Sequence, residues 1–391
     1  MDGRLWLMRL LRTTMSAVVL AAGLAVATSA PAQAAGSLNT AAQAGGSLDT
    51  AALEASLAGL PDAEASAALV QVRGSAGSWS GAAGHASVRS ERPPAADSRF
   101  RIGSMTKVFT ATVVLQLAAE GKLSLDGTVQ QYVPGFLPAS YAPITVRNLL
   151  TFTSGLNHVS VPHKTPAWFF EHRYDHWAPG SQIDLTQDLA FTPGESQRYG
   201  NVDYIMAGLV VEKVTGHTWA DEVNRRIIRP LHLNGTSTPG DDIRIPGPHA
   251  HGYEVTADGR RDVTLANTTL QWSAASIIST AGDLDRLMVA LFSGRLLPRP
   301  QLDEMFTVPA GITMFGTDTP AGYSAGLQRL DLGGTVIWGK SGDRPGYNNG
   351  MGATRDLSRR IVYSVNTLKM GGDQPVRAQR IIMAALSSGN R

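Results

Sequence analysis

A serine and a lysine near residue 105 have the types and the spacing needed for nucleophilic catalysis. In Gly103-Ser-Met-Thr-Lys107, the Lys107 amine would lie one helical turn from the Ser104 hydroxyl if a helix begins there. A serine hydroxyl attacks only when a base takes its proton, and a neighbouring lysine could be that base. The pair alone is a weak signal, because Ser-x-x-Lys also describes an ordinary helix start with an exposed lysine.

Two later stretches make the interpretation more specific. The tripeptide Tyr-Gly-Asn at 199–201 stands directly before a predicted helix, and Lys-Ser-Gly-Asp at 340–343 follows a predicted strand. The order S-x-x-K, Y-x-N and K-S/T-G is the signature arrangement of serine penicillin-recognising enzymes. Each residue also has a structural alternative: Tyr199 as a core tyrosine, Asn201 as a helix cap and Lys340 as a solvated strand end.

The chain resembles secreted D-alanyl-D-alanine carboxypeptidases/transpeptidases and class C β-lactamases over roughly residues 50–388. Besides the three motifs, the resemblance is carried by the stretches 98–107, 120–126, 149–156, 208–216, 226–231 and 276–287. It implies an α/β (α+β) fold of the β-lactamase/transpeptidase type, with a central antiparallel sheet flanked by helices and an inserted all-helical domain. It implies no cofactor and no metal.

The same resemblance implies a role for each motif residue. Ser104 would attack an amide or ester carbonyl to form an acyl-enzyme, while Lys107 and Tyr199 share the proton transfers. Nearby ammonium charge would lower the Tyr199 pKa, and the backbone N–H groups of Ser104 and Asp343 would form the oxyanion hole. The expected substrate-binding residues are Asn201, Lys340, Ser341, Gly342, Asp343, Trp272 and Gln328.

Two positions depart from the carboxypeptidase branch, whose third motif usually reads His-Thr-Gly-Thr and whose preceding strand carries a carboxylate-binding arginine. Here Asp343 replaces the last threonine and Gln328 aligns with the arginine. An aspartate repels a free carboxylate, so we hypothesise a substrate with an amide, an ester or an internal D-peptide bond there. Arg329 or Arg344 could compensate. Trp272 is interpreted as either a pocket wall or a core residue.

The predicted elements that must position these motifs are strands at both ends of the chain with helices between them. Strands are predicted at 67–73, 78–85, 324–331, 335–338, 346–354 and 360–367, and helices at 49–59, 104–120, 201–215, 219–229 and 375–386. This order indicates one sheet closed by both ends of the chain around a helical insertion. We expect one hydrolase domain over 61–388, with its sheet part at about 61–100 and 320–388 and its helical part at about 101–300.

The first 34 residues have the features of a secretory signal peptide. Arg4, Arg9 and Arg12 precede an apolar run at 15–27, and Ala32-Gln-Ala34 provides an A-x-A cleavage pattern. The run is too short for a membrane anchor. We therefore expect a signal peptide at 1–34, Sec-type secretion without a stable membrane anchor, and a flexible leader with a first helix over 35–60.

Composition excludes several classes of function. The formal net charge of +2 arises within the first 34 residues, and the neutral remainder disfavours nucleic-acid binding. The absence of cysteine excludes a thiol nucleophile and disulfides. His172 and His176, with Asp175 and His163 nearby, could hold zinc on a helix, but the zincin glutamate is missing. We expect a monomer acting on a small-molecule or peptide substrate, which would be a D-peptide, an ester or a β-lactam.

The sequence leaves three functions open. The favoured one is a D-alanyl-D-alanine carboxypeptidase-like D-peptidase acting on peptidoglycan-type or other D-residue peptides. An esterase, an amidase or a β-lactamase would use the same residues. A non-catalytic β-lactam or peptidoglycan binding protein is disfavoured, because such proteins usually lose a catalytic residue, whereas Ser104, Lys107, Tyr199 and Lys340 are all present.

Overall fold

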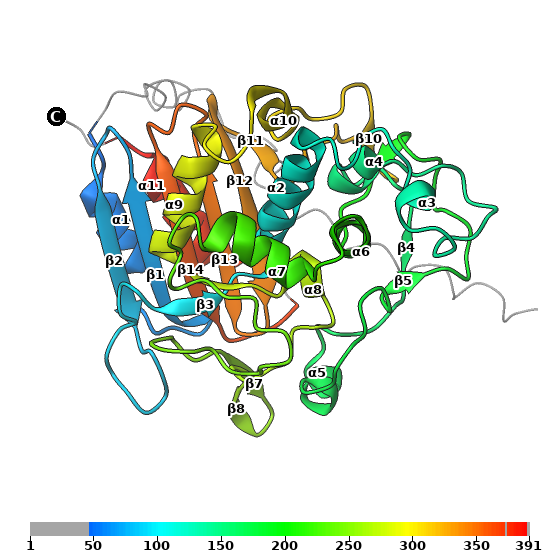
Figure 1. Ribbon diagram of the computed structural model, residues 1–391. Helices are drawn as coiled ribbons and strands as arrows, with labels where there is room; N and C mark the ends of the chain where they lie inside the picture. Colours follow the sequence, from blue (N-terminus) through cyan, green and yellow to red (C-terminus); the bar gives the residue numbers. More distant parts are fainter. Residues whose placement is uncertain (1–46, 372–373, 389–391) are drawn as a thin grey trace, which may run out of the picture.

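The centre of the fold is a six-stranded antiparallel sheet in the order β11-β12-β13-β14-β1-β2 (Figure 1). The computed structural model describes residues 47–371 and 374–388, so the expected signal peptide and most of the expected leader lie outside it. The predicted α/β fold with a central antiparallel sheet is confirmed. The strands are β1 (Ala65–Arg73), β2 (Trp79–Gly84), β11 (Gln328–Leu332), β12 (Thr335–Arg344), β13 (Tyr347–Ala353) and β14 (Arg360–Thr367).

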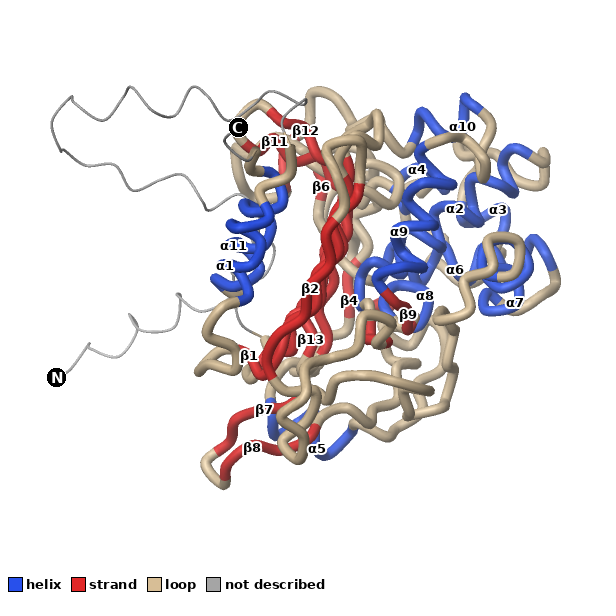
Figure 2. The backbone as a smooth tube through the Cα atoms, turned by 90° about the vertical axis from the view of Figure 1, so that its left-hand side faces the viewer, coloured by secondary structure: helices blue, strands red, loops and turns tan. Residues whose placement is uncertain are grey.

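Helices cover both faces of this sheet (Figure 2). On one face, α1 (Thr50–Leu57) and α11 (Val376–Leu386) pack against Val70, Val72 and Tyr363. On the other face lie α2 (Thr106–Ala119) and α9 (Ala281–Phe292), which belong to the larger core. Because both faces are covered, β1 is buried at its first eight positions, as its nearly continuous small and apolar sequence requires.

The two ends of the chain meet in the sheet, as the strand pattern predicted. β1 pairs with β14 and β14 with β13, so strands nearly 300 residues apart in sequence are neighbours. β11 pairs only with the first half of β12, from Leu332–Thr335 to Gln328–Gly339. Among the described residues, positions 340–344 therefore have a strand partner only on the β13 side. The third motif lies on this unpaired edge.

Between β3 (Arg99–Arg101) and β11 the chain forms more helices than strands, connected by long loops, and β3 pairs with β9 (Ile278–Thr280). This segment also contains short two-stranded ribbons that the sequence pattern did not indicate. Its further helices are α3 (Val129–Tyr132), α4 (Val146–Leu150), α5 (Pro166–His172), α6 (Val202–Thr215), α7 (Trp219–Val223), α8 (Trp272–Ala275) and α10 (Arg299–Glu304), with a 3-10 turn at Gly103–Met105 and a π-turn at Asn224–Ile228. The ribbons pair β4 (Asn157–His158) with β5 (Ile183–Asp184), β6 (Ser196–Gln197) with β10 (Thr313–Met314), and β7 (Tyr253–Thr256) with β8 (Gly259–Asp262).

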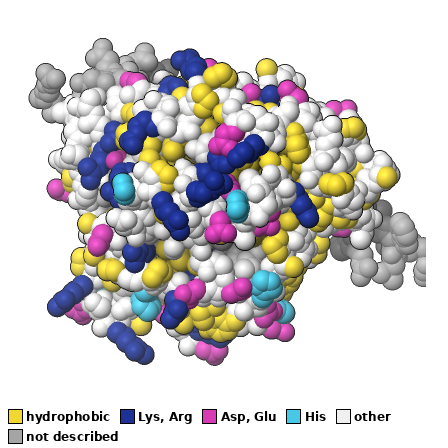
Figure 3. Space-filling model, viewed as in Figure 1, with side chains coloured by type: hydrophobic (Ala, Val, Ile, Leu, Met, Phe, Trp, Pro, Cys, Tyr) yellow, Lys and Arg dark blue, Asp and Glu magenta, His cyan; other side chains and the backbone are white. Residues whose placement is uncertain are grey.

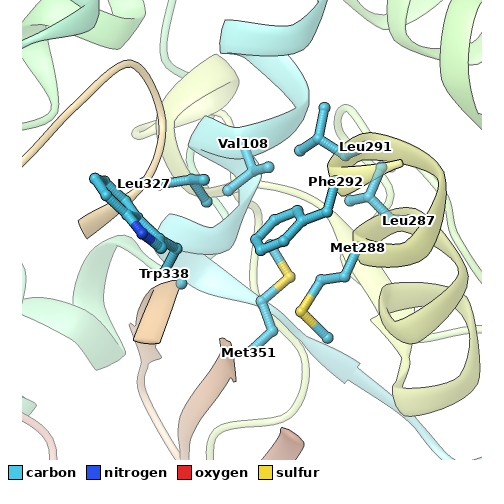
Figure 4. Close-up of a pocket in the computed structure, with 9 residues that line it drawn as sticks. Val108, Leu287, Met288, Leu291, Phe292, Leu327, Trp338 and Met351 are labelled. Carbon is cyan, nitrogen blue, oxygen red and sulfur yellow. The ribbon is translucent and has the colours of Figure 1, made fainter. Parts of the chain in front are cut away.

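An apolar seam fixes α2 against the sheet (Figure 4). Val108 on α2 and Leu291 on α9 meet Trp338 on β12 and Met351 on β13 around a small closed pocket lined by apolar side chains and Gly339. Val108 is fully buried, and burying such a side chain contributes about 1.5–3 kcal/mol. The seam lies one residue after Lys107 and two residues before Lys340, so it sets the distance between these two motifs.

The surface carries charges of both signs close to one another on the face shown in Figure 3. Within 47–371 and 374–388, every helix is too short or too polar to cross a bilayer.

Candidate active site

Two glycines allow the backbone around Ser104 to touch the third motif. Gly103 has a φ of 56°, and a Cβ there would lie 2.6 Å from the backbone nitrogen of Asp343. A Cβ on Gly342 would lie 1.9 Å from the Ile102 carbonyl oxygen and 3.1 Å from the Ser104 nitrogen. Only glycine fits such close backbone approaches. The contact brings the N–H groups of Ser104 and Asp343 to one place, as a two-donor oxyanion hole requires.

The Lys107 amine is fully buried and has three polar neighbours. Its Nζ lies 3.2 Å from Ser104 Oγ, 2.7 Å from Asn201 Oδ1 and 3.1 Å from the Ala274 carbonyl oxygen. The last two oxygens can only accept hydrogen bonds. A neutral amine has two N–H donors, so donating to both oxygens directs its lone pair at the Ser104 hydroxyl. This arrangement suits proton removal from Ser104.

Asn201 orients the lysine and does not act as a side-chain helix cap. It stands at the N-cap position of α6, but its side chain makes no capping hydrogen bond. The start of α6 is fixed instead by Tyr204, whose hydroxyl donates to the Leu150 carbonyl at 2.9 Å. Ser273 Oγ donates to the Tyr204 carbonyl at 2.9 Å, which joins α6 to α8. The structural alternative for Asn201, a simple cap, is therefore not supported.

Tyr199 lies between the two lysines of the motifs. Lys107 Nζ is 5.1 Å and Lys340 Nζ 4.6 Å from the centroid of its ring. Tyr323 stacks on the ring at a centroid distance of 4.9 Å, and Phe152 packs against it at 4.8 Å. These aromatic neighbours fix the phenol in the pocket. The structure thus brings Ser104, Lys107, Tyr199, Asn201 and Lys340 into one cluster.

Burial is the main influence on the pKa values of the groups in this cluster. It lowers the pKa of Lys107 well below its usual value, with Lys340 adding to the shift, and it lowers the pKa of Lys340 to about 7. Burial raises the pKa of the Tyr199 phenol, and the Ser104 side chain offsets only part of that rise. The expected lowering of the Tyr199 pKa is therefore wrong, because desolvation outweighs the nearby amines. Lys107 is the better base, and Tyr199 keeps its proton.

Two expected substrate-binding residues lie elsewhere. Gln328 pairs with Gly339, and it lines a cavity of about 50 Å³ together with Leu330 and Ile382 of α11. It therefore faces the side of the sheet opposite Lys340, and Arg329 projects to the Lys340 side. The alignment of Gln328 with a carboxylate-binding arginine placed it on the wrong face.

Trp272, the first residue of α8, is partly buried and packs against the main hydrophobic core. Its ring meets Trp219 edge-on at a centroid distance of 5.8 Å, and a Cβ on Gly208 would lie 2.8 Å from it. Trp219 is almost fully buried, and its Nε1 donates to Thr110 Oγ1 at 3.0 Å. The core interpretation of Trp272 is thus favoured over the pocket-wall interpretation.

Asp343 has a partner that the motifs did not indicate. Its Oδ2 lies 2.9 Å from Lys164 Nζ, and both side chains are partly exposed. Ser341, two residues earlier on the same edge, accepts a hydrogen bond from Lys340 Nζ on its carbonyl oxygen at 3.0 Å. The aspartate is therefore one half of an ion pair, where the sequence showed only a lone negative charge.

The other residues that sequence reasoning missed are Tyr323, Phe152 and Asp203. Asp203 is buried in the first turn of α6, and burial raises its pKa to about 7, with Ser154 offsetting part of the rise. None belongs to the three catalytic motifs, although Phe152 lies in the stretch 149–156, and their roles depend on packing between distant segments. Asp203, two residues after Asn201, offered the one sequence signal, an acidic residue on an apolar helix.

The histidine pair considered for zinc does not share one helix. α5 ends at His172, so His176 lies beyond it. His172 Nδ1 contacts Asp175 at 2.8 Å, whereas His176 Nδ1 contacts Asp241 at 2.7 Å. Within the described part of the chain, three or more histidine or acidic side chains do not gather as a metal site would require.

Comparison with known proteins gives a family and several relatives. The Beta-lactamase family model matches residues 53–386. Penicillin-binding protein 4* of Bacillus subtilis is 24% identical over 305 residues, which are 72% of this chain and 64% of that protein. Esterase EstB of Burkholderia gladioli is 30% identical over 205 residues, which are 42% of this chain and 50% of that protein. The chain thus spans less than two thirds of the length of these relatives.

Solved structures match more completely. A D-stereospecific amidohydrolase from Streptomyces sp. is 33% identical with a TM-score of 0.74, and the match covers 86% of this chain and 98% of that one. A D-amino acid amidase from Ochrobactrum anthropi SV3 is 24% identical with a TM-score of 0.71 over 86% and 97% of the two chains, which supports the fold alone. Together with the family match, these likenesses show that the protein belongs to the Beta-lactamase family and is a serine hydrolase of the β-lactamase and penicillin-binding-protein fold.

Proposed function

We propose that this serine hydrolase cleaves the amide bond that follows a D-amino acid residue, through an acyl-enzyme on Ser104. The observation that carries the proposal is the buried Lys107 amine, 3.2 Å from Ser104 Oγ and held by two acceptor oxygens. The preference for D-residues is supported by the likeness to the Streptomyces amidohydrolase, whose chain is matched over 98% of its length.

The chemistry divides between the two proton-carrying groups. Lys107, whose pKa burial lowers, takes the Ser104 proton as Oγ attacks the carbonyl carbon. The N–H groups of Ser104 and Asp343 hold the resulting oxyanion. Tyr199, whose pKa burial raises, stays protonated and donates to the leaving amine. The Lys107 ammonium then returns a proton to the Tyr199 phenolate. Neutral Lys107 takes a proton from the water that attacks the ester and passes it to Ser104 Oγ as the acid leaves, which restores all three groups.

The charges beside the third motif favour a neutral substrate group there over an anionic one. The Asp343 carboxylate stands at this edge and Gln328 lies on the opposite face of the sheet, whereas Arg329, on the Lys340 side, pairs with Trp338 further along β12 and lies 4.0 Å from the Asp331 carboxylate. An amide, an ester or an internal D-peptide bond fits such an edge better than a free terminal carboxylate does. D-alanyl-D-alanine carboxypeptidase activity in the strict sense is therefore the second candidate, and esterase activity is a third with the same acyl-enzyme.

Secretion is part of the proposal and is supported by the N-terminal sequence alone. The basic start, the short apolar run and the A-x-A pattern at 32–34 favour export by the Sec route. The substrate would then be met outside the cytoplasm. Intact-mass analysis of the exported protein tests this, since cleavage after residue 34 fixes its mass.

The function is tested with matched D and L substrates. We expect purified protein to release ammonia or amine from D-amino acid amides and D-peptide amides, with much slower turnover of the L forms. The Ser104→Ala variant should be inactive and should not be labelled by a fluorescent penicillin. Equal turnover of D and L amides would overturn the stereochemical part, and activity retained in Ser104→Ala would overturn the mechanism.

A further inference from the structure

A single ion pair joins two separate segments of the chain beside the proposed oxyanion hole. Asp343 lies on the unpaired edge of β12, and Lys164 lies in the segment between β4 and α5. Their Oδ2 and Nζ atoms are 2.9 Å apart. The pair therefore connects the helical insertion to the motif strand at the place where a substrate must lie.

The carboxylate of this pair is close to the reacting carbonyl. The Asp343 N–H is one of the two proposed oxyanion donors, and its own side chain branches from the adjacent Cα. Standard bond lengths then place the carboxylate within about 6 Å of the oxyanion. A charge at that distance acts on whatever group the substrate carries beyond its scissile bond.

The lysine reaches this place from a locally fixed turn. The His163 backbone N–H donates to the Val161 carbonyl at 2.8 Å, and the Thr165 N–H donates to the Pro162 carbonyl at 2.9 Å. The Lys164 carbonyl oxygen packs against Gly371, where a Cβ would lie 2.8 Å away. The turn holds the lysine backbone, so only its side chain has to move for the pair to open.

The exposure of the pair makes it easy to open. The side chains of Lys164 and Asp343 are 52% and 38% exposed. Pairs of this kind contribute at most about 1 kcal/mol to stability. A substrate group can therefore compete with either partner at little energetic cost, which suits recognition better than structural support.

The neighbouring charges do not cancel this effect. Arg344 follows Asp343 on β12, is buried and donates to the Gln271 side chain; its own pKa is lowered to about 10 by burial, so it stays charged at neutral pH. Burial lowers the pKa of His163 to about 4, so it is neutral there. Of these four neighbouring groups, Lys164 and Asp343 are the ones that are both charged and partly exposed.

We propose that the Lys164–Asp343 pair selects substrates by the charge of the leaving group: Asp343 disfavours a free carboxylate, and Lys164 limits that repulsion. The inference rests on the proposed hydrolysis of D-residue amides at Ser104. It makes Lys164, which lies outside the three motifs, a residue that determines substrate specificity. Substrates with a neutral leaving group are favoured over those with an anionic one.

The test compares N-acetyl-D-Ala-D-Ala amide with the same peptide as a free acid, as a ratio of kcat/KM values for cleavage of the bond between the two D-Ala residues, followed as release of D-alaninamide or D-alanine. Asp343→Asn should lower the amide-to-acid ratio at least about fivefold, because Lys164 then attracts the carboxylate unopposed. Lys164→Gln should raise the ratio by at least about fivefold. The double variant should lie between the two. All of these effects should shrink when the salt concentration rises tenfold.

A matched pair elsewhere provides the control. Lys122 and Glu120 are also 2.9 Å apart, with side chains 48% and 39% exposed. Lys122→Gln should leave the ratio unchanged, and melting temperatures should show that each variant is folded. Unchanged ratios in both Asp343→Asn and Lys164→Gln would overturn the inference and leave the proposed function intact.

Failure of the proposed function gives a different pattern. If neither peptide is turned over, the ratio is measured with N-acetyl-D-Ala joined as an ester to D-lactate or D-lactamide, which present the same two charges. Ester turnover with the expected ratio changes supports the inference while refuting amide cleavage. Ester turnover with unchanged ratios refutes both, as does a lack of turnover of all four compounds.

Discussion

The contact between Asn201 and Lys107 offers the sharpest perturbation of the site. Asn201 Oδ1 accepts from Lys107 Nζ at 2.7 Å, and its side chain does not cap α6. Asn201→Ala therefore removes one of the two oxygens that direct the amine lone pair at Ser104, without removing a helix cap. We expect slower acylation in a folded protein.

The magnitude follows from the type of bond. A hydrogen bond to a charged group contributes about 1.5–3 kcal/mol, and one pKa unit corresponds to about 1.4 kcal/mol. Losing an acceptor that favours the ammonium form should lower the Lys107 pKa by about one to two units. Lys107 is a base only above its pKa, so the acid limb of kcat/KM should move to lower pH. Poorer orientation should lower the plateau about 10- to 100-fold.

Asn201→Asp provides the opposing variant. Its carboxylate favours the ammonium, so the Lys107 pKa should rise and the acid limb should move to higher pH. The assay is kcat/KM for a D-amino acid amide from about pH 4 to pH 10, with melting temperatures as the control for folding. An acid limb that stays in place, or that moves in the same direction in both variants, would refute Lys107 as the base.

Three further changes test other parts of the site. Burial lowers the pKa of Lys340 to about 7, so its positive charge is lost as the pH rises through 7, and kcat/KM should fall there. The Lys340→Arg variant keeps its charge, so it should lack this fall in kcat/KM at alkaline pH when measured in the same pH series. Tyr199→Phe should lower kcat/KM for amides by about 10²- to 10⁴-fold and much less for p-nitrophenyl esters, whose leaving group needs no proton; equal losses would contradict the acid role. Gly342→Ala, with its Cβ 1.9 Å from the Ile102 carbonyl oxygen, should lower both the melting temperature and the rate, and a fully active variant would contradict the close approach.

The sheet and its main helices could be predicted because their signals are local. The apolar runs of β1 and β14 and the helix over 201–215 have periodicities that the structure reproduces within a few residues. Asp49 accepts from the Ala52 N–H and begins the first helix, as a capping residue should. The short ribbons, such as β4 with β5, are two residues long, and no periodic pattern of that length can be read from sequence.

The site residues that belong to sequence motifs could be predicted, whereas those positioned by tertiary packing could not. The positions of Ser104, Lys107, Tyr199, Asn201 and Lys340 follow from three short stretches in order. Their protonation does not, since it depends on burial by distant segments.

Three features of the site depended on the tertiary structure. The face of the sheet on which Gln328 lies depends on the register between β11 and β12. The choice between the two interpretations of Trp272 depends on the position of Trp219. The ion pair of Asp343 depends on Lys164, which is 179 residues earlier in the sequence and is brought close only by tertiary structure.

The acyl-enzyme on Ser104 is the central claim, and intact-protein mass spectrometry tests it most directly. Protein mixed rapidly with a D-amino acid ester or a penicillin should gain the mass of one acyl group, and fragmentation should place it on the peptide containing Ser104. The Ser104→Ala variant should gain nothing. An adduct on another residue, or D-amide turnover by Ser104→Ala, would contradict the account.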